Sequence, residues 1–149
     1  MGKVYITKNE LQEVVKENIL KYLTETQNVF TIKEYYPKQN TNDKEFVKQN
    51  KEVIWDFLNN GYKHVGYDEG FLGCDSPKSI MRNCVLLKVA YFNKKIVAIS
   101  IYTGYQGGYK CVGITATTDN DYRDFGKNAI KQIIQDDIGL YDEFYWAEC

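Results

Sequence analysis

The feature that most constrains the fold is a pair of short apolar runs in the second half of this 149-residue chain. Cys84–Tyr91 (CVLLKVAY) and Ile96–Tyr102 (IVAISIY) are almost continuously apolar, and the turn Phe92–Lys95 joins them. Two such runs on either side of a tight turn predict an antiparallel hairpin. A glycine-rich connection at Gly104–Gly108, expected to be flexible, then leads to a third predicted strand at Tyr109–Thr117.

A helix and a further strand are predicted after the third strand. The helix is expected to place on one face the apolar residues Ala129, Ile130, Ile133, Ile134 and Ile138. Gly139 ends this pattern, and Tyr141–Glu148 (YDEFYWAE) is typical of a strand. A helical crossover between two strands favours parallel pairing. The expected fold class is therefore α/β (α+β), with a mixed sheet, an antiparallel hairpin and one helix crossover to a parallel strand.

The first half of the chain is expected to add helices to that sheet. An amphipathic helix is predicted within residues 1–24, because Thr7–Glu10 forms a capping box and the apolar residues of Leu11–Leu23 share one face. This helix can pack on its own domain or on a partner. Val29–Tyr35 alternates weakly and is expected to be an edge strand, ended by a proline.

A second helix is predicted from Phe46 to Leu58, with a left-handed cap at Asn59–Gly61. The following stretch, Tyr62–Arg82, contains glycines and a proline and has no sustained period. Such a stretch is either a lid or binding segment, or a wrapped segment with one short helix near Pro77–Met81. Both interpretations stay open at the level of sequence.

Length and composition are those of one domain, expected to span residues 1–149 with its core at 29–149. A net charge of −1 gives no basic excess for nucleic-acid binding. Four scattered cysteines and one histidine argue against a metal site. The sequence shows no secretory signal and no apolar segment of membrane-spanning length, so a cytoplasmic protein without a membrane partner is expected. Its Lys-, Asn-, Ile- and Tyr-rich composition suggests an AT-rich genome, such as that of a phage, in which case the cytoplasm is the host's.

The junction between the third strand and the following helix is the best-placed anion site in the sequence. Asp121–Asn128 (DYRDFGKN) brings a glycine and two basic residues to the first turn of this helix. Helix N-termini offer unpaired N–H groups and a partial positive charge, and Gly126 is expected to let a ligand approach the backbone. Arg123 and Lys127 would add charge-assisted contacts, so a pyrophosphate suits this position.

The order of elements and this loop resemble the GNAT N-acyltransferase superfamily over roughly Val29–Cys149, with the best match from Cys84 onward. The family's cofactor loop reads Q/R-x-x-G-x-G/A, and Arg123–Asn128 matches it up to the last position. Asn128 stands where the family has a small residue, and Ala129 follows. The resemblance implies acetyl-CoA or another acyl-CoA as the cofactor, and no metal.

The resemblance also implies which residues contact that cofactor. The pantetheine arm would pair with the backbone of Ile114, Thr115, Ala116 and Thr117. The pyrophosphate would lie against Arg123, Phe125, Gly126, Lys127 and Asn128. An amine of a small molecule or protein would attack the thioester directly, and the candidate base is Glu148. The alternative for Glu148 is a solvated carboxylate at the end of a strand.

The family continues past this strand with a helix and a terminal hairpin, whereas the sequence here stops at Cys149. Three explanations are open: the sequence is cut short, a protein partner or a second copy completes the sheet, or this is a reduced relative that binds without catalysing. Two hypotheses therefore remain, an acyl-CoA-dependent N-acyltransferase and a non-catalytic interaction or inhibitor protein on the same scaffold. The N-terminal helix, the open last strand and the Tyr62–Arg82 loop motivate the second hypothesis.

Other chemically suggestive residues are expected to have ordinary roles. His64 is a lone loop histidine, expected to be structural or solvated. Asp136 and Asp137 fall in the last helical turn, where negative charge opposes the helix dipole, and are expected to be solvated. Cys149 lacks a visible activating base.

Overall fold

The computed structural model of the chain describes residues 12, 30–67, 76–139 and 144–146. The helix predicted within residues 1–24 therefore lies outside the described residues, apart from Gln12. The described elements follow in the order β1 (Thr31–Tyr35), α2 (Thr41–His64), α3 (Pro77–Asn83), β2 (Leu86–Phe92), β3 (Lys95–Tyr105), β4 (Gly108–Ala116), α4 (Arg123–Gly139) and β5 (Phe144–Trp146).

The strands form one five-stranded sheet in the order β1-β2-β3-β4-β5. The pairs β1–β2, β2–β3 and β3–β4 are antiparallel, whereas β4–β5 is parallel. The antiparallel hairpin, the edge position of β1 and the helix crossover to a parallel strand are thereby confirmed. The expected fold class is correct.

Two tight turns join the three central strands. Asn93 and Lys94 have φ values of 50° and 66°, and Gln106 and Gly107 have 48° and 82°. Two consecutive residues with positive φ are typical of a type I′ turn, whose twist matches that of the flanking strands. The prediction of a flexible connection at Gly104–Gly108 was wrong, because β3 continues to Tyr105 and only two residues separate it from β4.

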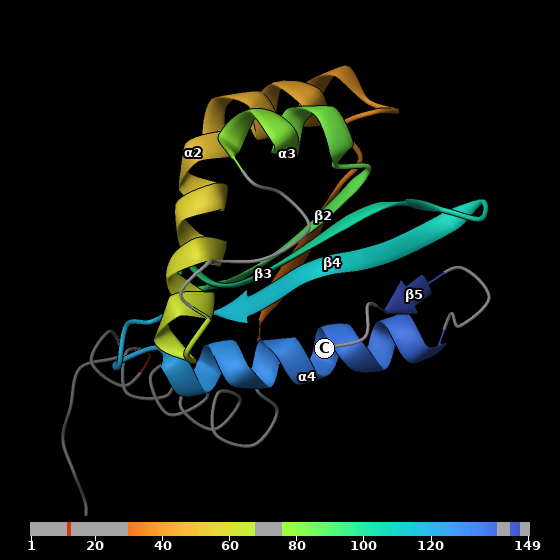
Figure 1. The fold of residues 1–149 in the computed structure, drawn as a ribbon. Helices are drawn as coiled ribbons and strands as arrows, with labels where there is room; N and C mark the ends of the chain where they lie inside the picture. Colours follow the sequence, from red (N-terminus) through yellow and green to blue (C-terminus); the bar gives the residue numbers. More distant parts are fainter. Residues whose placement is uncertain (1–11, 13–29, 68–75, 140–143, 147–149) are drawn as a thin grey trace, which may run out of the picture.

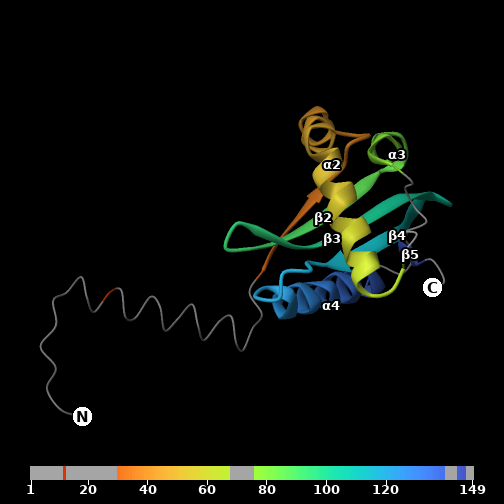
Figure 2. The same cartoon turned by 60° about the vertical axis from the view of Figure 1, so that its left-hand side comes forward.

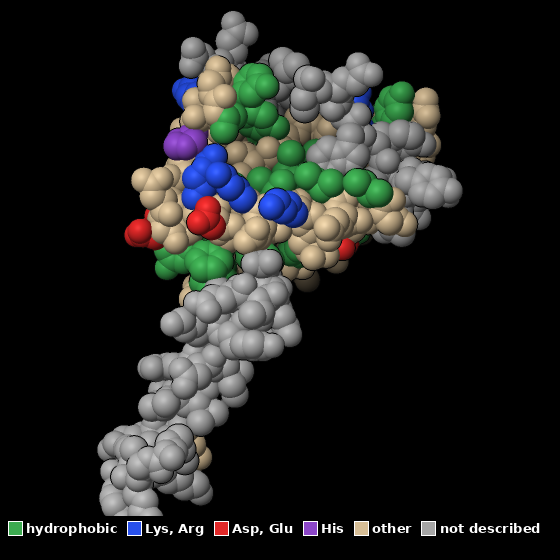
Figure 3. All heavy atoms as spheres, turned by 90° about the horizontal axis from the view of Figure 1, so that it is seen from below, with side chains coloured by type: hydrophobic (Ala, Val, Ile, Leu, Met, Phe, Trp, Pro, Cys, Tyr) green, Lys and Arg blue, Asp and Glu red, His purple; other side chains and the backbone are tan. Residues whose placement is uncertain are grey.

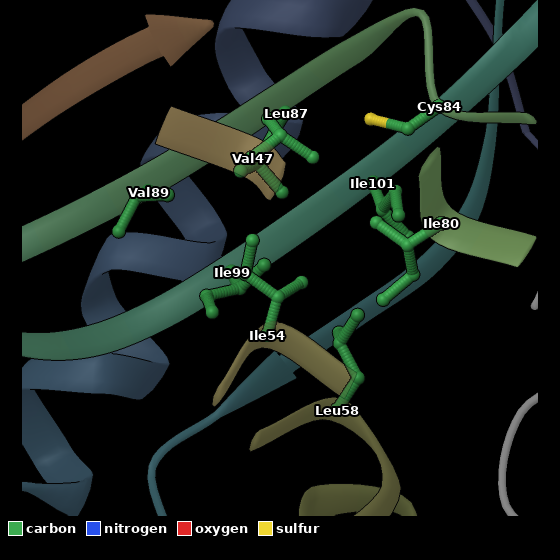
Figure 4. Packing of buried hydrophobic residues seen from close by; sticks show 9 residues of the cluster. All are labelled: Val47, Ile54, Leu58, Ile80, Cys84, Leu87, Val89, Ile99 and Ile101. Carbon is green, nitrogen blue, oxygen red and sulfur yellow. The ribbon is translucent and has the colours of Figure 1, made fainter. Parts of the chain in front are cut away.

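Helices cover both faces of the sheet (Figures 1 and 2): α2 and α3 lie on one side and α4 on the other. Because successive strand residues point to opposite faces, alternate side chains of β2 and β3 reach each helix layer. Figure 4 shows the larger core cluster, in which residues of α2, α3, β2 and β3 meet: Val47, Ile54, Leu58, Ile80, Cys84, Leu87, Val89, Ile99 and Ile101. Because α2 and α4 both pack on β4, they fix the position of the end of β4 relative to the start of α4.

The end of α2 differs from the prediction. The helix passes through Gly61 and continues to His64. A Cβ atom at Gly61 would lie 2.0 Å from Oγ1 of Thr115, so glycine here allows α2 to approach β4 closely. The left-handed glycine that follows the helix is Gly66, with φ of 101°.

The short helix predicted near Pro77–Met81 is confirmed as α3. Ser76 caps it, because its side chain accepts a hydrogen bond from the N–H of Ser79 and the Ser79 hydroxyl accepts one from the N–H of Ser76. A lid role for the preceding segment stays a prediction, since residues 68–75 lie outside the described residues.

Candidate functional site

The candidate site starts at a half-open edge of β4. β5 pairs with β4 at Tyr109, Lys110 and Cys111. Val112 is a bulge residue, because Ile101 of β3 pairs with Gly113 and the next β3 residue pairs with Cys111. From Gly113 to Ala116 no strand of the described chain pairs with the second edge of β4. The backbone of this half of β4 can therefore pair with a ligand.

The loop from β4 into α4 is held by its own hydrogen bonds. The N–H of Thr117 donates to the carbonyl of Val97 over 2.8 Å. The Thr117 hydroxyl accepts from the N–H of Asp119, and the Asp119 carbonyl accepts from the N–H of Tyr122. Arg123 closes the loop, because its Nη1 donates to the Thr117 carbonyl over 3.0 Å. One donor of the predicted phosphate-binding arginine thus positions the loop, and a guanidinium group has four further N–H donors.

An ion pair fixes the same loop from the outside. Nζ of Lys95, at the start of β3, lies 2.5 Å from Oδ2 of Asp119. The hydrogen bond to Lys95 and, to a smaller extent, the one from the N–H of Asp121 hold the pKa of Asp119 below its ordinary value. The same hydrogen bond raises the pKa of Lys95. Lys95 also lies over the ring of Tyr122, 4.7 Å from its centroid, so it contacts two residues of the loop.

Gly126 is required for packing. A Cβ atom there would lie 2.3 Å from the carbonyl oxygen of Val97 and 3.0 Å from Cβ of Ala116. The expected reason for this glycine, access of a ligand to the backbone, is therefore corrected: Gly126 is buried and lets α4 lie directly on β3 and β4. Its N–H donates to the carbonyl of Tyr122, which makes it part of the helix.

The amides at the start of α4 begin two residues before the segment Phe125–Asn128, whose backbone was predicted to hold the pyrophosphate. The first N–H groups of a helix have no acceptor within the helix, and in α4 these belong to Arg123, Asp124 and Phe125. Of the four predicted amides, that of Phe125 lies in this first turn, whereas those of Lys127 and Asn128 lie further along the helix. The Phe125 ring stacks on Phe92 at 4.2 Å between centroids.

The predicted pantetheine contacts lie next to α2. The N–H of Ile114 donates to the hydroxyl oxygen of Tyr62 over 3.0 Å. Thr115 is buried against Gly61 of α2, and the side chain of Ala116 packs against Gly126 of α4. The structure thus brings the Ile114–Thr117 segment and the start of α4 together, as predicted, but one of the backbone donors already has a partner within the chain.

Basic side chains gather at one end of the surface formed by α4. Figure 3, which views the molecule from the α4 side, shows Lys and Arg side chains (blue) close to the histidine (purple) and next to hydrophobic side chains (green). Lys127 and His64 are both exposed, and His64 ends α2. Acidic side chains (red) lie beside them in the same view. Asp121 and Asp124 are exposed at the start of α4, so the charge at this end of the surface is mixed.

Sequence reasoning missed a buried polar cluster under α4. Asp137 is fully buried, and its Oδ1 lies 2.7 Å from Nζ of Lys88 on β2. Its second oxygen accepts a hydrogen bond from the hydroxyl of Tyr102, which in turn accepts one from Ser100. Burial and, to a smaller extent, the hydrogen bond to Asp137 raise the pKa of Tyr102 far above its ordinary value, so this hydroxyl stays a donor.

The prediction that Asp137 is solvated was therefore wrong. The helix face is rotated from the expected one: Gly126, Ala129, Ile133 and Asp137 are buried, whereas Ile138 is 60% exposed. The partner of Asp137 was visible in the sequence as Lys88, a charged residue inside an otherwise apolar run, since a buried lysine needs a counter-charge.

The remaining predicted features add little to the site. Glu148, the candidate base, lies outside the described residues. Within the described parts of the chain, no three His, Cys, Asp or Glu side chains gather as metal ligands. Likewise, no described helix is long and apolar enough to cross a membrane.

No protein-family model matches the sequence, and no curated protein matches it either. Among solved structures, the chain is similar to one named as the C-terminal domain (DUF2156) of a lysylphosphatidylglycerol synthetase from Agrobacterium fabrum. The similarity has a TM-score of 0.46 and 15% sequence identity, and it covers 80% of this chain. The chain spans 37% of the length of that structure.

Proposed function

We propose that this chain binds an acyl-CoA between the open half of β4 and the first turn of α4, and that it transfers the acyl group to an amine. The observation that carries this proposal is the half-paired β4, in which Gly113–Ala116 has an open edge beside the start of the helix. An extended pantetheine arm can pair with such an edge as a strand would. The adjacent helix start supplies donors for a pyrophosphate.

The charged residues have separate roles in this proposal. Lys127 is exposed near the start of α4 and would contact a phosphate directly. Arg123 would hold the Thr117 carbonyl, keep the loop in place and direct its other N–H groups to the phosphate. The amides of Arg123, Asp124 and Phe125 would complete the anion site.

The reaction would be a direct transfer. The amine nitrogen attacks the thioester carbonyl, a C–N bond forms, the C–S bond breaks, and the thiolate leaves with a proton. A base takes the proton of the amine, and Glu148 remains the candidate. Holding the two reactants side by side supplies much of the rate, without a covalent enzyme intermediate.

Thermal unfolding with and without acetyl-CoA tests the proposal, because a ligand that binds the folded state raises the midpoint with its concentration. Lys127→Glu should weaken the shift, whereas Lys131→Glu, one turn further along α4 and also exposed, should keep it. No shift at millimolar acetyl-CoA in the unchanged protein would refute the proposal. Gly126 is unsuitable for this test, since any side chain there disturbs packing.

A second candidate function is non-catalytic interaction with a protein. The short β5 favours it, because among the described residues it leaves the Gly113–Ala116 edge of β4 without a strand partner, and an exposed strand edge can pair with another chain. In this case a partner, or a second copy of the chain, would pair with the open edge next to β5. Sedimentation analysis checks the second copy: a monomer at all concentrations would exclude it.

A further inference from the structure

A hollow lies beside β1, at the other edge of the sheet from β5. Its volume is about 530 Å³, and residues of β1, α2, β2 and the β2–β3 turn line it. Small-molecule sites commonly have volumes of about 300–1,000 Å³. In the sheet, β2 and β3 lie between β1 and β4. At the turn, however, the hollow comes near the β4–α4 loop, because Lys95, which follows the lining residues Asn93 and Lys94, pairs with Asp119.

Aromatic rings form one wall of the hollow, and they are held in place by one another. Tyr35 of β1 stacks on Phe46 of α2, with centroids 4.0 Å apart and planes within 2°. The hydroxyl of Tyr35 lies 3.2 Å from that of Tyr91 on β2. All three rings are half-buried, so each keeps some surface for a ligand. Flat preformed surfaces of this kind suit a planar ring.

The tyrosine pair also keeps a donor. One of the two hydroxyl groups donates a hydrogen bond to the other, and either can be the donor. The accepting hydroxyl retains its own proton, which is left to donate to a ligand. Burial and, to a smaller extent, the hydrogen bond to Tyr35 raise the pKa of Tyr91, so the Tyr91 hydroxyl keeps its proton near physiological pH.

Two lysines set the sign of the charge that the hollow accepts. Lys33 lies over the Tyr91 ring, 5.6 Å from its centroid. Lys94 stands in the tight turn with φ of 66°, so its backbone is fixed by the hairpin. None of the described residues that line the hollow is acidic. An anion is therefore attracted there without a competing carboxylate.

We propose that this hollow is a second binding site that takes a small anion carrying an aromatic ring, of the mononucleotide class. The ring would lie against the tyrosine and phenylalanine wall, and the phosphate would reach Lys33 and Lys94. Stacking on aromatic side chains and charge-assisted contacts to a phosphate together recognise this chemistry.

Adenosine monophosphate is a suitable probe, titrated into ¹⁵N-labelled protein with amide shifts as the readout. Shifts are expected at β1 and at the Asn93–Lys94 turn. Lys33→Gln and Lys94→Gln should each weaken binding about tenfold. Lys48→Gln, an exposed lysine of α2 away from the hollow, is the matched control and should bind as the unchanged protein does.

Two partial probes separate the ring from the charge. Adenosine lacks the phosphate and inorganic phosphate lacks the ring, so each should bind at least about tenfold more weakly than the nucleotide. Shifts confined to the start of α4 would overturn the proposal, as would equal binding of inorganic phosphate. Unchanged binding by the variant that carries both lysine substitutions would overturn it as well.

Discussion

Nζ of Lys88 on β2 lies 2.7 Å from Oδ1 of Asp137 near the end of α4, and both side chains are buried. The Tyr102 hydroxyl donates to the other carboxylate oxygen. A second carboxylate, Glu34 of β1, lies 3.5 Å from the same ammonium group and is partly exposed. This cluster joins β1, β2, β3 and α4 at one point, and therefore holds the helix that carries the proposed anion site.

Asp137→Asn should lower the free energy of unfolding by about 3–5 kcal/mol, because it leaves Lys88 buried without its main counter-charge. Urea unfolding measures this change. Asp136→Asn is the matched control: the neighbouring carboxylate is exposed, and its replacement should change stability by less than about 0.5 kcal/mol. Equal effects of the two substitutions would contradict the role given to the buried pair.

The same pair can be examined with a double change. Lys88→Met together with Asp137→Leu removes both charges and leaves apolar groups of similar size. The loss of stability should be clearly smaller than the sum of the two single losses, because each single variant leaves an unpaired buried charge. A strictly additive result would show that the two charges do not interact in the fold.

Gly61→Ala should destabilise the protein by about 1–3 kcal/mol, although alanine is the better helix former, because the new methyl group overlaps with Thr115. Adding Thr115→Ala should restore part of the loss. Gly139→Ala, at the end of α4, has nothing within 4 Å of the new Cβ and should be neutral or stabilising. Thermal unfolding of the three variants checks this order.

Tyr62→Phe should speed hydrogen exchange at the Ile114 amide, because the hydroxyl that accepts its hydrogen bond is removed. If the pantetheine arm pairs there, acetyl-CoA affinity should rise about fivefold, since the ligand no longer competes with a bond worth about 1 kcal/mol. Tyr67→Phe removes a hydroxyl from a nearby exposed ring and serves as the control. Weaker binding by Tyr62→Phe would mean that the tyrosine contacts the ligand itself.

The Lys95–Asp119 pair should make a small, pH-dependent contribution to stability. The pKa of Asp119 is lowered from 3.8, so its contribution is present above that pH and is lost as pH falls through the folded value. The pKa of Lys95 is raised from 10.5, so its part is present below that pH and is lost above it. Asp119→Asn should therefore cost stability near neutral pH and have no effect in strong acid. The difference should shrink with added salt, because both side chains are partly exposed.

The central strands were predictable because their signals are local. Apolar runs of strand length and a polar turn identify β2 and β3 without knowledge of their neighbours. The helix ends and the buried charge were not predictable in this way. Asn59–Gly61 has the sequence of a helix cap, yet Gly61 lies inside α2, where its lack of a side chain makes room for Thr115, a residue far along the chain. The position of Asp137 in the last helical turn is typical of a solvated carboxylate, yet it is buried because it pairs with Lys88 on β2.

The candidate site shows the same division. Arg123–Asn128 was placed correctly at the start of a helix after a buried strand, from its pattern alone. The bonds that define the site were not foreseeable, since Val97 and Lys95 reach the β4–α4 loop, and Tyr62 reaches Ile114 of β4, from other elements. The sequence indicated correctly that glycine is needed at position 126, but the expected reason was wrong. A sequence alone cannot distinguish a glycine that makes room for a ligand from one that makes room for a neighbouring strand.

The two type I′ turns have a consequence for how the molecule opens. They join β2, β3 and β4, which follow one another in the sequence, so the contacts within this three-stranded meander need only short loops to close. β1 and β5 pair instead with strands that are distant along the chain, and each has one neighbour in the sheet. Partial opening of the native protein should therefore begin at the two borders of the sheet, while the meander persists. Both proposed ligands would bind at those borders, and each would slow hydrogen exchange most at its own edge.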